Sequence, residues 1–164
     1  MKQSILLATI AILIISSCTS VEDGNECNEL FSTSFEESSD YEMFEGYAYA
    51  SSDDVTTNAG DSSLYVCGGC IAPHLYFDIG PFDQDYDLSV SFIAKTDLQA
   101  SVSVYPVNGI NDKLAFTIED SIWTLYEHEQ TLFLAKGELL RMEFLSGGIA
   151  AVNSYFDLLQ VCAE

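Results

Sequence analysis

Hydrophobic and polar residues alternate along most of this chain, and that period-two pattern constrains its fold more than any other feature of the sequence. The alternation is clearest in Tyr86–Phe92 and recurs in Ser101–Tyr105, Leu114–Ile118 and Leu140–Phe144. Successive side chains of a β-strand point to opposite faces of a sheet. Each of these segments is therefore predicted to be a strand with one buried face.

Turn-forming residues separate the alternating segments, for example at Asn108-Gly109, Lys136-Gly137 and Gly147-Gly148. Many short strands divided by such turns are typical of β-sandwiches and jelly rolls. We expect an all-β, antiparallel sandwich or jelly roll of about nine to eleven short strands. No segment predicts a helix longer than one or two turns, and residues 29–164 are expected to form one domain.

The first 17 residues are expected to be a signal peptide. Lys2 precedes an apolar run, Ile5–Ile15, which is too short to cross a bilayer as a helix because that takes about 20 apolar residues. The next residues, Ile15-Ser16-Ser17-Cys18, resemble a lipobox, the motif read by lipoprotein signal peptidase. The resemblance implies that residues 1–17 are removed, that Cys18 carries a lipid, and that residues 18–28 form the lipidated cysteine and tether. The alternative is an ordinary signal peptide with an incidental cysteine.

The protein is thus expected to be exported and anchored to a membrane through the lipid. The residue after Cys18 is not the Asp that resembles an inner-membrane retention signal. The acidic segment 21–23 resembles tags that send some lipoproteins to the cell exterior. We therefore expect the protein to be located in the outer membrane and exposed at the cell surface. Other outer-membrane proteins are candidate partners.

The chain is strongly acidic, and its charge limits the partners it can have. It contains 26 Asp and Glu residues against 5 Lys and Arg, a formal net charge of −21, and loss of Lys2 with the signal leaves −22. Such a surface repels nucleic acid and anionic lipid headgroups, so neither is an expected partner. It does suit Ca²⁺, which prefers carboxylate and carbonyl oxygens.

Four cysteines remain when Cys18 is set aside: Cys27, Cys67, Cys70 and Cys162. An even number in an exported chain predicts disulfide bonds, and four cysteines allow three pairings. We favour Cys27 with Cys162, which would join the two ends of the domain, and Cys67 with Cys70, which would close a Gly-Gly turn. A redox Cys-x-x-Cys and a zinc site are the alternatives, although no helix is predicted after Cys70, as a redox motif requires.

Several short motifs also follow one another in a characteristic order along residues 29–163. They are Phe35-Glu36, Gly60-x-x-Ser63-Leu64, Tyr86-x-Leu88-Ser89 running to Ala94-Lys95, Trp123 with Tyr126 and Phe133, and Tyr155-Phe156-Asp157-Leu158-Leu159. This order resembles the carbohydrate-binding-module jelly rolls of the galactose-binding-like group. The resemblance implies that the first and last strands lie side by side, which would bring Cys27 near Cys162.

The same resemblance implies a structural calcium ion, bound by Glu36 and Asp157 with backbone carbonyls completing the shell. Ca²⁺ takes six to eight oxygen ligands, so two carboxylates from opposite ends of the chain would be held together by it. Glu37, Asp40 and Asp61 are nearby candidates for further ligands. The alternative is that Glu36 and Asp157 are solvated charges at strand ends.

Sugar binding requires exposed aromatic rings beside hydrogen-bonding side chains. The candidates are aromatic residues that interrupt the alternation or lie near turns: Trp123, Tyr47, Tyr49, Tyr76 and Tyr105. Trp123 alternates with Leu125, so a place in the core is the alternative for it. Most aromatic residues of a β-sandwich pack in its core, so the same alternative applies to each tyrosine.

Nothing in the sequence predicts catalysis. The two histidines, His74 and His128, lie in no metallohydrolase motif, and no glycine-rich phosphate loop is present. We therefore expect a membrane-anchored, surface-exposed lipoprotein that binds a polysaccharide or oligosaccharide without acting on it. A structural or adhesive lipoprotein with the same fold and no sugar site is the alternative.

Overall fold

A computed structural model describes most of the predicted domain. The described residues are 27–45, 49–52, 60–68, 74–109, 112–147 and 152–164. Cys18, Tyr47 and Cys70, for which the sequence makes predictions, lie outside them. Among the described residues no helix is long and apolar enough to cross a membrane.

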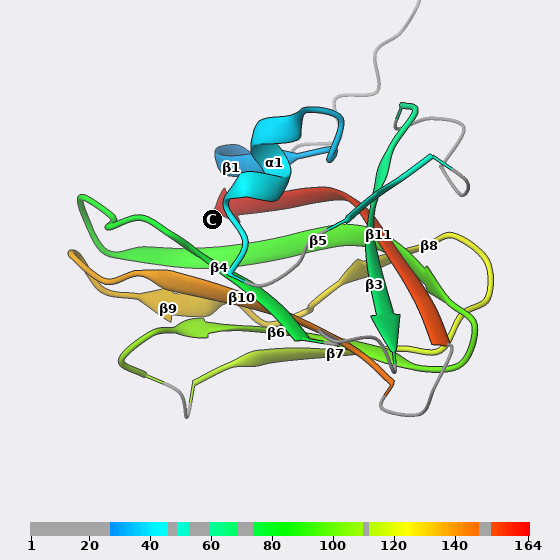
Figure 1. Cartoon of the computed structure of the whole chain (residues 1–164). Helices are drawn as coiled ribbons and strands as arrows, with labels where there is room; N and C mark the ends of the chain where they lie inside the picture. Colours follow the sequence, from blue (N-terminus) through cyan, green and yellow to red (C-terminus); the bar gives the residue numbers. More distant parts are fainter. Residues whose placement is uncertain (1–26, 46–48, 53–59, 69–73, 110–111, 148–151) are drawn as a thin grey trace, which may run out of the picture.

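Two antiparallel sheets form the two layers of a sandwich (Figure 1). The small sheet has four strands in the order β4 (His74–Ile79), β10 (Leu140–Ser146), β6 (Ala100–Pro106) and β7 (Leu114–Ile118). The large sheet is built on the order β2 (Tyr49–Ser51), β3 (Ser63–Gly68), β11 (Val152–Ala163), β5 (Tyr86–Thr96) and β8 (Thr124–Glu127). Two further strands complete it: β1 (Asn28–Thr33) pairs with β11, and β9 (Leu132–Leu134) pairs with β5.

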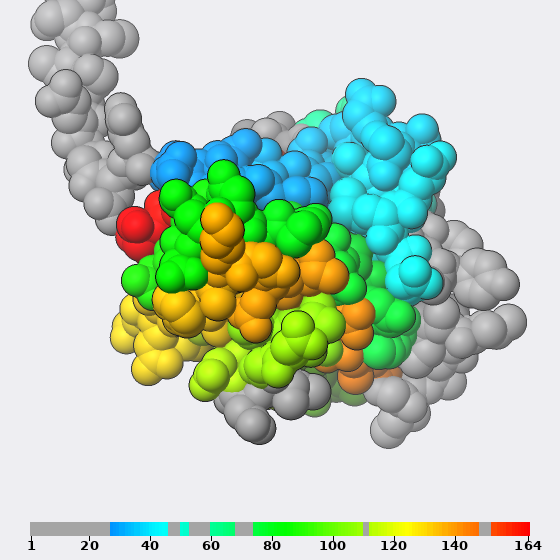
Figure 2. All heavy atoms as spheres, turned by 90° about the vertical axis from the view of Figure 1, so that its left-hand side faces the viewer, coloured from blue at the N-terminus to red at the C-terminus, as the bar shows by residue number. Residues whose placement is uncertain are grey.

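The eleven strands of the described residues and their antiparallel pairing confirm the predicted fold class. One short helix, α1 (Ser38–Glu42), occurs in the same part of the chain, and it follows β1 at the top of the molecule in Figures 1 and 2. The predicted alternation is also confirmed. In β5, for example, Leu88, Val90, Phe92 and Ala94 are buried between the sheets, while the residues between them are partly exposed.

Aromatic rings fill much of the space between the sheets. Phe44 contacts Phe77 and Phe144, with ring centroids 5.0 and 6.0 Å away, and Phe144 contacts Phe156 of the other sheet at 5.1 Å. Full burial of such side chains contributes roughly 1.5–3 kcal/mol each to folding. The inward positions of both sheets are thus used for packing, which leaves the outward positions for function.

The first and last strands are neighbours, as the resemblance implied. β1 pairs with the second half of β11, and a disulfide bond joins Cys27 to Cys162 with the Cα atoms 5.4 Å apart. Figure 2 shows β1 in blue beside the last residues in red. This pairing of cysteines is confirmed. Cys67 is also disulfide-bonded, and its predicted partner Cys70 lies outside the described residues.

Candidate functional site

The outward side of the small sheet presents a row of polar and charged side chains on two of its four strands, β4 and β10. In β4, His74, Tyr76 and Asp78 alternate with buried Leu75 and Phe77. The neighbouring strand β10 presents three more outward side chains, Arg141, Glu143 and Leu145. We call the side chains of His74, Tyr76, Asp78, Arg141 and Glu143 the charged face.

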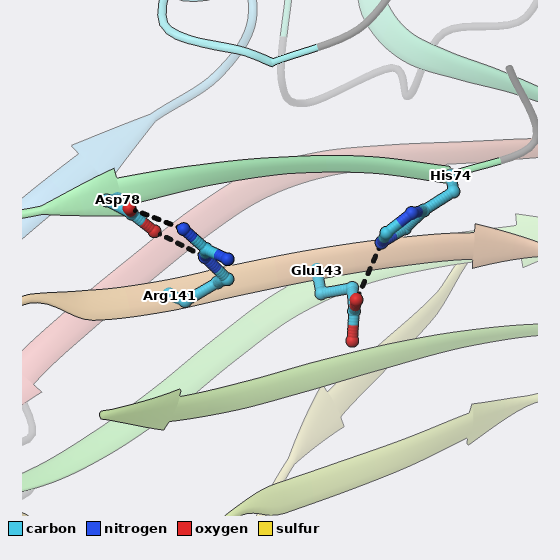
Figure 3. Close-up of polar contacts among 4 residues, drawn as sticks. All are labelled: His74, Asp78, Arg141 and Glu143. Atoms are coloured by element: carbon cyan, nitrogen blue, oxygen red, sulfur yellow. Dashed lines mark hydrogen bonds and ion pairs between the residues drawn. The ribbon is translucent and has the colours of Figure 1, made fainter. Parts of the chain in front are cut away.

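Arg141 is held in place by two neighbours on β4. Its Nε and Nη2 donate hydrogen bonds of 2.7 and 2.8 Å to the two carboxylate oxygens of Asp78, which lies directly opposite it in the strand register (Figure 3). Its guanidinium carbon also lies 4.2 Å from the ring centroid of Tyr76. The bond to Asp78 raises the pKa of Arg141 above its ordinary value. Both charged side chains remain accessible to a ligand, with 27% and 28% of their surfaces exposed.

A second pair lies beside the first. His74 Nε2 is 2.6 Å from Glu143 Oε1, and the two side chains reach toward each other across β4 and β10 in Figure 3. The His74 ring centroid is 5.8 Å from that of Tyr76. The Tyr76 ring therefore lies between the Asp78–Arg141 and His74–Glu143 pairs, each of which joins β4 to β10. These neighbours restrict the orientation of the ring.

Small side chains cover the other half of the same sheet. Apart from Tyr105, the outward residues of β6 and β7 are Ser101, Ser103, Ala115 and Thr117, and Ser103 lies opposite Glu143 in the register. A hollow of about 270 Å³ lies at this end of the sheet, lined by Ser101, Thr117 and Leu145 among others. The charged face thus borders a surface of small side chains, which leaves room for an extended ligand.

Tyr105 is the last aromatic residue of this surface. It lies opposite Arg141 in the register of β6 and β10, and only 8% of it is exposed. Burial raises the pKa of its hydroxyl, with a further contribution from the negative charge of Glu143. Tyr76 and Tyr105, two of the candidate ligand-binding residues, are therefore brought together on one face.

The other candidate aromatic residues that the structure describes do not belong to this face. Trp123 precedes β8 in the large sheet, 6.5 Å from the ring centroid of Tyr155, and is partly exposed rather than in the core. Tyr49 lies in β2 at the edge of the same sheet, opposite Tyr65. The candidates are thus divided between the two sheets. Sequence alternation shows which residues point outward but not which sheet a strand joins.

Glu36 and Asp157, the predicted calcium ligands, lie close enough to influence each other. Asp157 is fully buried; its Oδ1 accepts a hydrogen bond of 2.8 Å from the Leu158 backbone N–H, and its Oδ2 has no hydrogen-bond partner among the described residues. Burial, together with the negative charge of Glu36, raises the pKa of the Asp157 carboxyl to about 7. A buried carboxyl group with an unpaired oxygen beside a second carboxylate is costly without a cation.

The backbone around these two carboxylates is unusual. Phe35, before Glu36, has φ of 57°, and Leu158, after Asp157, has φ of 47°. Such values are uncommon for residues other than glycine and occur often at functional sites. The Glu36 carboxylate accepts hydrogen bonds of 3.0 Å from the N–H groups of Asp61 and Ser62.

Gly60 lies directly beneath this carboxylate. A Cβ at position 60 would collide with Glu36 Oε1, so no other residue leaves room for Glu36 in its present position. The candidate ligands Glu37 and Asp40 hold the start of α1 instead, since the Glu37 N–H donates to Asp40 Oδ2 at 3.3 Å.

The oxygen atoms around Glu36 and Asp157 limit how an ion could be held. No group of three or more His, Cys, Asp or Glu side chains suited to a metal occurs among the described residues. Within the described part of the chain, an ion here would thus rest on Glu36, Asp157 and non-carboxylate oxygens.

The charged side chains Asp78, Arg141 and Glu143 are not among the residues predicted from the sequence. Their signal is present, because each occupies the polar position of an alternating strand. Charged residues at such positions are usually only solvated. They form a candidate site only because β4 pairs with β10, and these two strands lie far apart in the sequence.

No family model matches this chain, and no curated protein matches it. Solved structures match it in fold. The C-terminal family 22 carbohydrate-binding module of Clostridium thermocellum Xyn10B superposes with a TM-score of 0.57 at 13% identity, over 83% of this chain and 93% of the module. The CBM22-1 xylan-binding domain of Paenibacillus barcinonensis Xyn10C gives 0.55 at 17% identity, over 84% and 95%.

A third structure, TmCBM61 in complex with β-1,4-galactotriose, gives a TM-score of 0.53 at 10% identity, over 82% of this chain and 88% of that module. At such low identities the likeness extends to the fold and to no individual residue. The chain has the jelly-roll fold of carbohydrate-binding modules.

Proposed function

We propose that this protein is a membrane-anchored lipoprotein that binds a glycan without catalysis, through the outward side of its small sheet. The observation that supports the proposal is the charged face, where Tyr76 is held between the Asp78–Arg141 and His74–Glu143 pairs. Sugar recognition combines an aromatic ring with a few fixed polar groups, and this face supplies both. The matched modules support the same function, since one is a xylan-binding domain and another is bound to β-1,4-galactotriose.

The arrangement suits a sugar because its polar groups are already held in position. Each charged side chain is fixed by a partner on the adjacent strand, so little conformational freedom is lost when a hydroxyl group binds. The exposed carboxylate and guanidinium edges can accept from and donate to sugar hydroxyls. Because the protein has a net charge of −21, a neutral glycan is favoured over an acidic one.

We further propose that Glu36 and Asp157 bind a structural calcium ion. The unpaired buried oxygen of Asp157 and the nearby Glu36 carboxylate, for which Gly60 leaves room, fit a hard cation. The ion would join the segment after β1 to β11, which lies in the opposite layer from the charged face. Its proposed role is therefore to stabilise the fold and not to contact sugar.

The binding proposal is tested with the soluble domain, first on a glycan array and then by calorimetry with xylohexaose, β-1,4-galactotriose and the array hits. Tyr76→Ala should weaken binding of the best ligand by roughly tenfold or more. The substitution removes an aromatic contact with the sugar and also the ring against which the Arg141 guanidinium packs. Arg141→Gln alone should also weaken binding by about tenfold or more, because charge-assisted hydrogen bonds contribute about 1.5–3 kcal/mol.

Tyr155→Ala is the matched control, because Tyr155 is a partly exposed tyrosine on the outward side of the large sheet. It should leave glycan affinity unchanged. If no glycan on the array binds, or if Tyr155→Ala and Tyr76→Ala weaken binding equally, the charged face is not the sugar site. The structural or adhesive lipoprotein would then be the better description.

A further inference from the structure

The outward side of the large sheet differs in chemistry from the charged face. Cross-strand neighbours on this side are Tyr65 of β3, Tyr155 of β11 and Lys95 of β5, which follow one another in register. Trp123 extends the row, because it directly precedes Thr124, which lies opposite Ala94, and its ring centroid is 6.5 Å from that of Tyr155. We call this surface the apolar face, made of Tyr65, Lys95, Ile122, Trp123, Leu125 and Tyr155.

Two aliphatic side chains close to Trp123 in the sequence are exposed to solvent. Ile122 is 72% exposed, and Leu125, opposite Ile93 in the register, is 58% exposed. Isolated exposed hydrophobic residues are common, but here both lie within two residues of Trp123, whose ring neighbours that of Tyr155. Contiguous apolar surface of this kind marks a site of contact with another apolar surface.

The one cation of the apolar face, Lys95, lies beside aromatic rings, as lysines often do in proteins that contact the surface of a membrane. The Lys95 ammonium lies 5.5 Å from the Trp123 ring centroid and 5.3 Å from that of Tyr155. Trp and Tyr are the residues enriched where a protein meets the boundary between bilayer and water, and lysine places its chain along apolar surface with its charge toward the headgroups. Acidic residues of the neighbouring described segments lie toward the two ends of the face, with Glu127 at one end and Asp97 and Asp120 at the other.

The place where the N-terminal segment joins the domain indicates that the partner of the apolar face is a bilayer. Cys27, the first described residue, is bonded to Cys162 of the same large sheet, and Cys162 lies opposite Ser89 of β5. Lys95 is six residues further along β5, which is about 20 Å at roughly 3.3 Å per residue. Cys18 precedes Cys27 by nine residues, a length that spans at most about 30 Å. A lipid on Cys18 would hold this sheet within reach of the bilayer.

We propose that the apolar face rests on the surface of the bilayer that holds the lipid of Cys18. The inference depends on the lipid anchor of the proposed function. Because the anchor confines the domain near the membrane, a weak contact is enough to orient it. The charged face lies on the opposite side of the sandwich (Figure 1), so the glycan site is turned toward the medium.

Trp123 is the only tryptophan in the chain, so its fluorescence reports on this face alone. The lipidated full-length protein is reconstituted into phosphatidylcholine–phosphatidylethanolamine vesicles, with and without phosphatidylcholine brominated near the headgroup. Bromine quenches tryptophan only at short range, so we expect strong quenching of Trp123. Ile122→Ser with Leu125→Ser should reduce it several-fold, whereas Leu145→Ser, an exposed leucine of the small sheet, should not change it.

Quenching no greater than in vesicles that lack bromine would overturn the proposal, and so would equal quenching in the double variant. Concentration-dependent dimerisation of the Cys18→Ala protein, with the Trp123 emission shifting as dimers form, would assign the face to a second copy instead. If Cys18 proves to have no lipid, coupling residues 18–164 through Cys18 to a maleimide lipid tests the face by the same measurement. Glycan binding is measured separately on soluble protein, so failure of either proposal is recognised independently.

Discussion

At the scale of single residues, the strongest functional indication besides the charged face is the environment of Asp157. A buried carboxyl group normally has hydrogen bonds to both oxygens, and here one oxygen has none among the described residues. Its neighbour Glu36 adds repulsion instead of compensation. Two residues with left-handed backbone, Phe35 and Leu158, directly adjoin these two carboxylates in the chain. The proposed divalent cation would resolve the conflict by supplying positive charge to both.

Calcium should therefore raise the melting temperature of the domain. A ligand that binds only the folded state at 100 times its Kd stabilises it by about 2.7 kcal/mol, which corresponds to several degrees for a domain of this size. Asp157→Asn and Glu36→Gln should each remove most of the rise, and Glu127→Gln, an exposed acid elsewhere on the surface, should keep it. Equal stabilisation by Mg²⁺ that survives both substitutions would indicate general screening of charge and no site.

Gly60 allows a sharper test of the same site. Gly60→Ala should lower stability and also abolish the calcium response, because the new Cβ would occupy the position of the Glu36 carboxylate. Gly137→Ala is the matched control: Gly137 also has positive φ, 83°, but no atom lies within 4 Å of the place that its Cβ would take. Both changes introduce backbone strain of about 1 kcal/mol. Only the first should alter calcium binding, as measured by calorimetry.

At the scale of elements, the sequence predicts the strands well and their partners poorly. Alternation in Tyr86–Phe92 or Leu140–Phe144 is a local property, so it can be recognised without knowledge of the fold. The pairing of β4 with β10, which places Asp78 beside Arg141, depends on packing across the whole domain. Hence the sequence identifies single aromatic residues such as Tyr76, but not the charged side chains that surround them in the folded chain.

The link between β1 and β11 is the exception, because the cysteines reveal it. The Cys27–Cys162 bond closes a loop with a sequence separation of 135 residues. In the chain-entropy model a loop of this length is worth about 5 kcal/mol, a large part of the roughly 5–15 kcal/mol that stabilises a typical domain. Cys27→Ser with Cys162→Ser should therefore lower the free energy of unfolding by several kcal/mol in denaturant titrations. A change below about 1 kcal/mol would mean that the strand pairing alone holds the ends together.

At the scale of the whole molecule, the two outward surfaces of the sandwich suit different partners. The charged face belongs to the small sheet, and the apolar face belongs to the large sheet, from which the chain leaves at Cys27. The acidic composition of the chain favours solubility and disfavours contact with anionic lipid or polyanions. Anchor, apolar face and charged face would then lie in that order from the membrane outward.

This order depends on the lipid, which makes Cys18 the decisive position. Cys18→Ala should abolish incorporation of labelled fatty acid and release the protein from the membrane fraction. The reason is that each buried CH₂ contributes about 0.8 kcal/mol and more than one acyl chain is needed for stable anchoring. Thr19→Ala, at the adjacent position, should retain the label. The purified Cys18→Ala protein should bind glycan with unchanged affinity, because Cys18 precedes the strands that present Tyr76 and Arg141. Undiminished labelling of the Cys18→Ala protein would contradict the lipobox and, with it, the proposed orientation on the membrane.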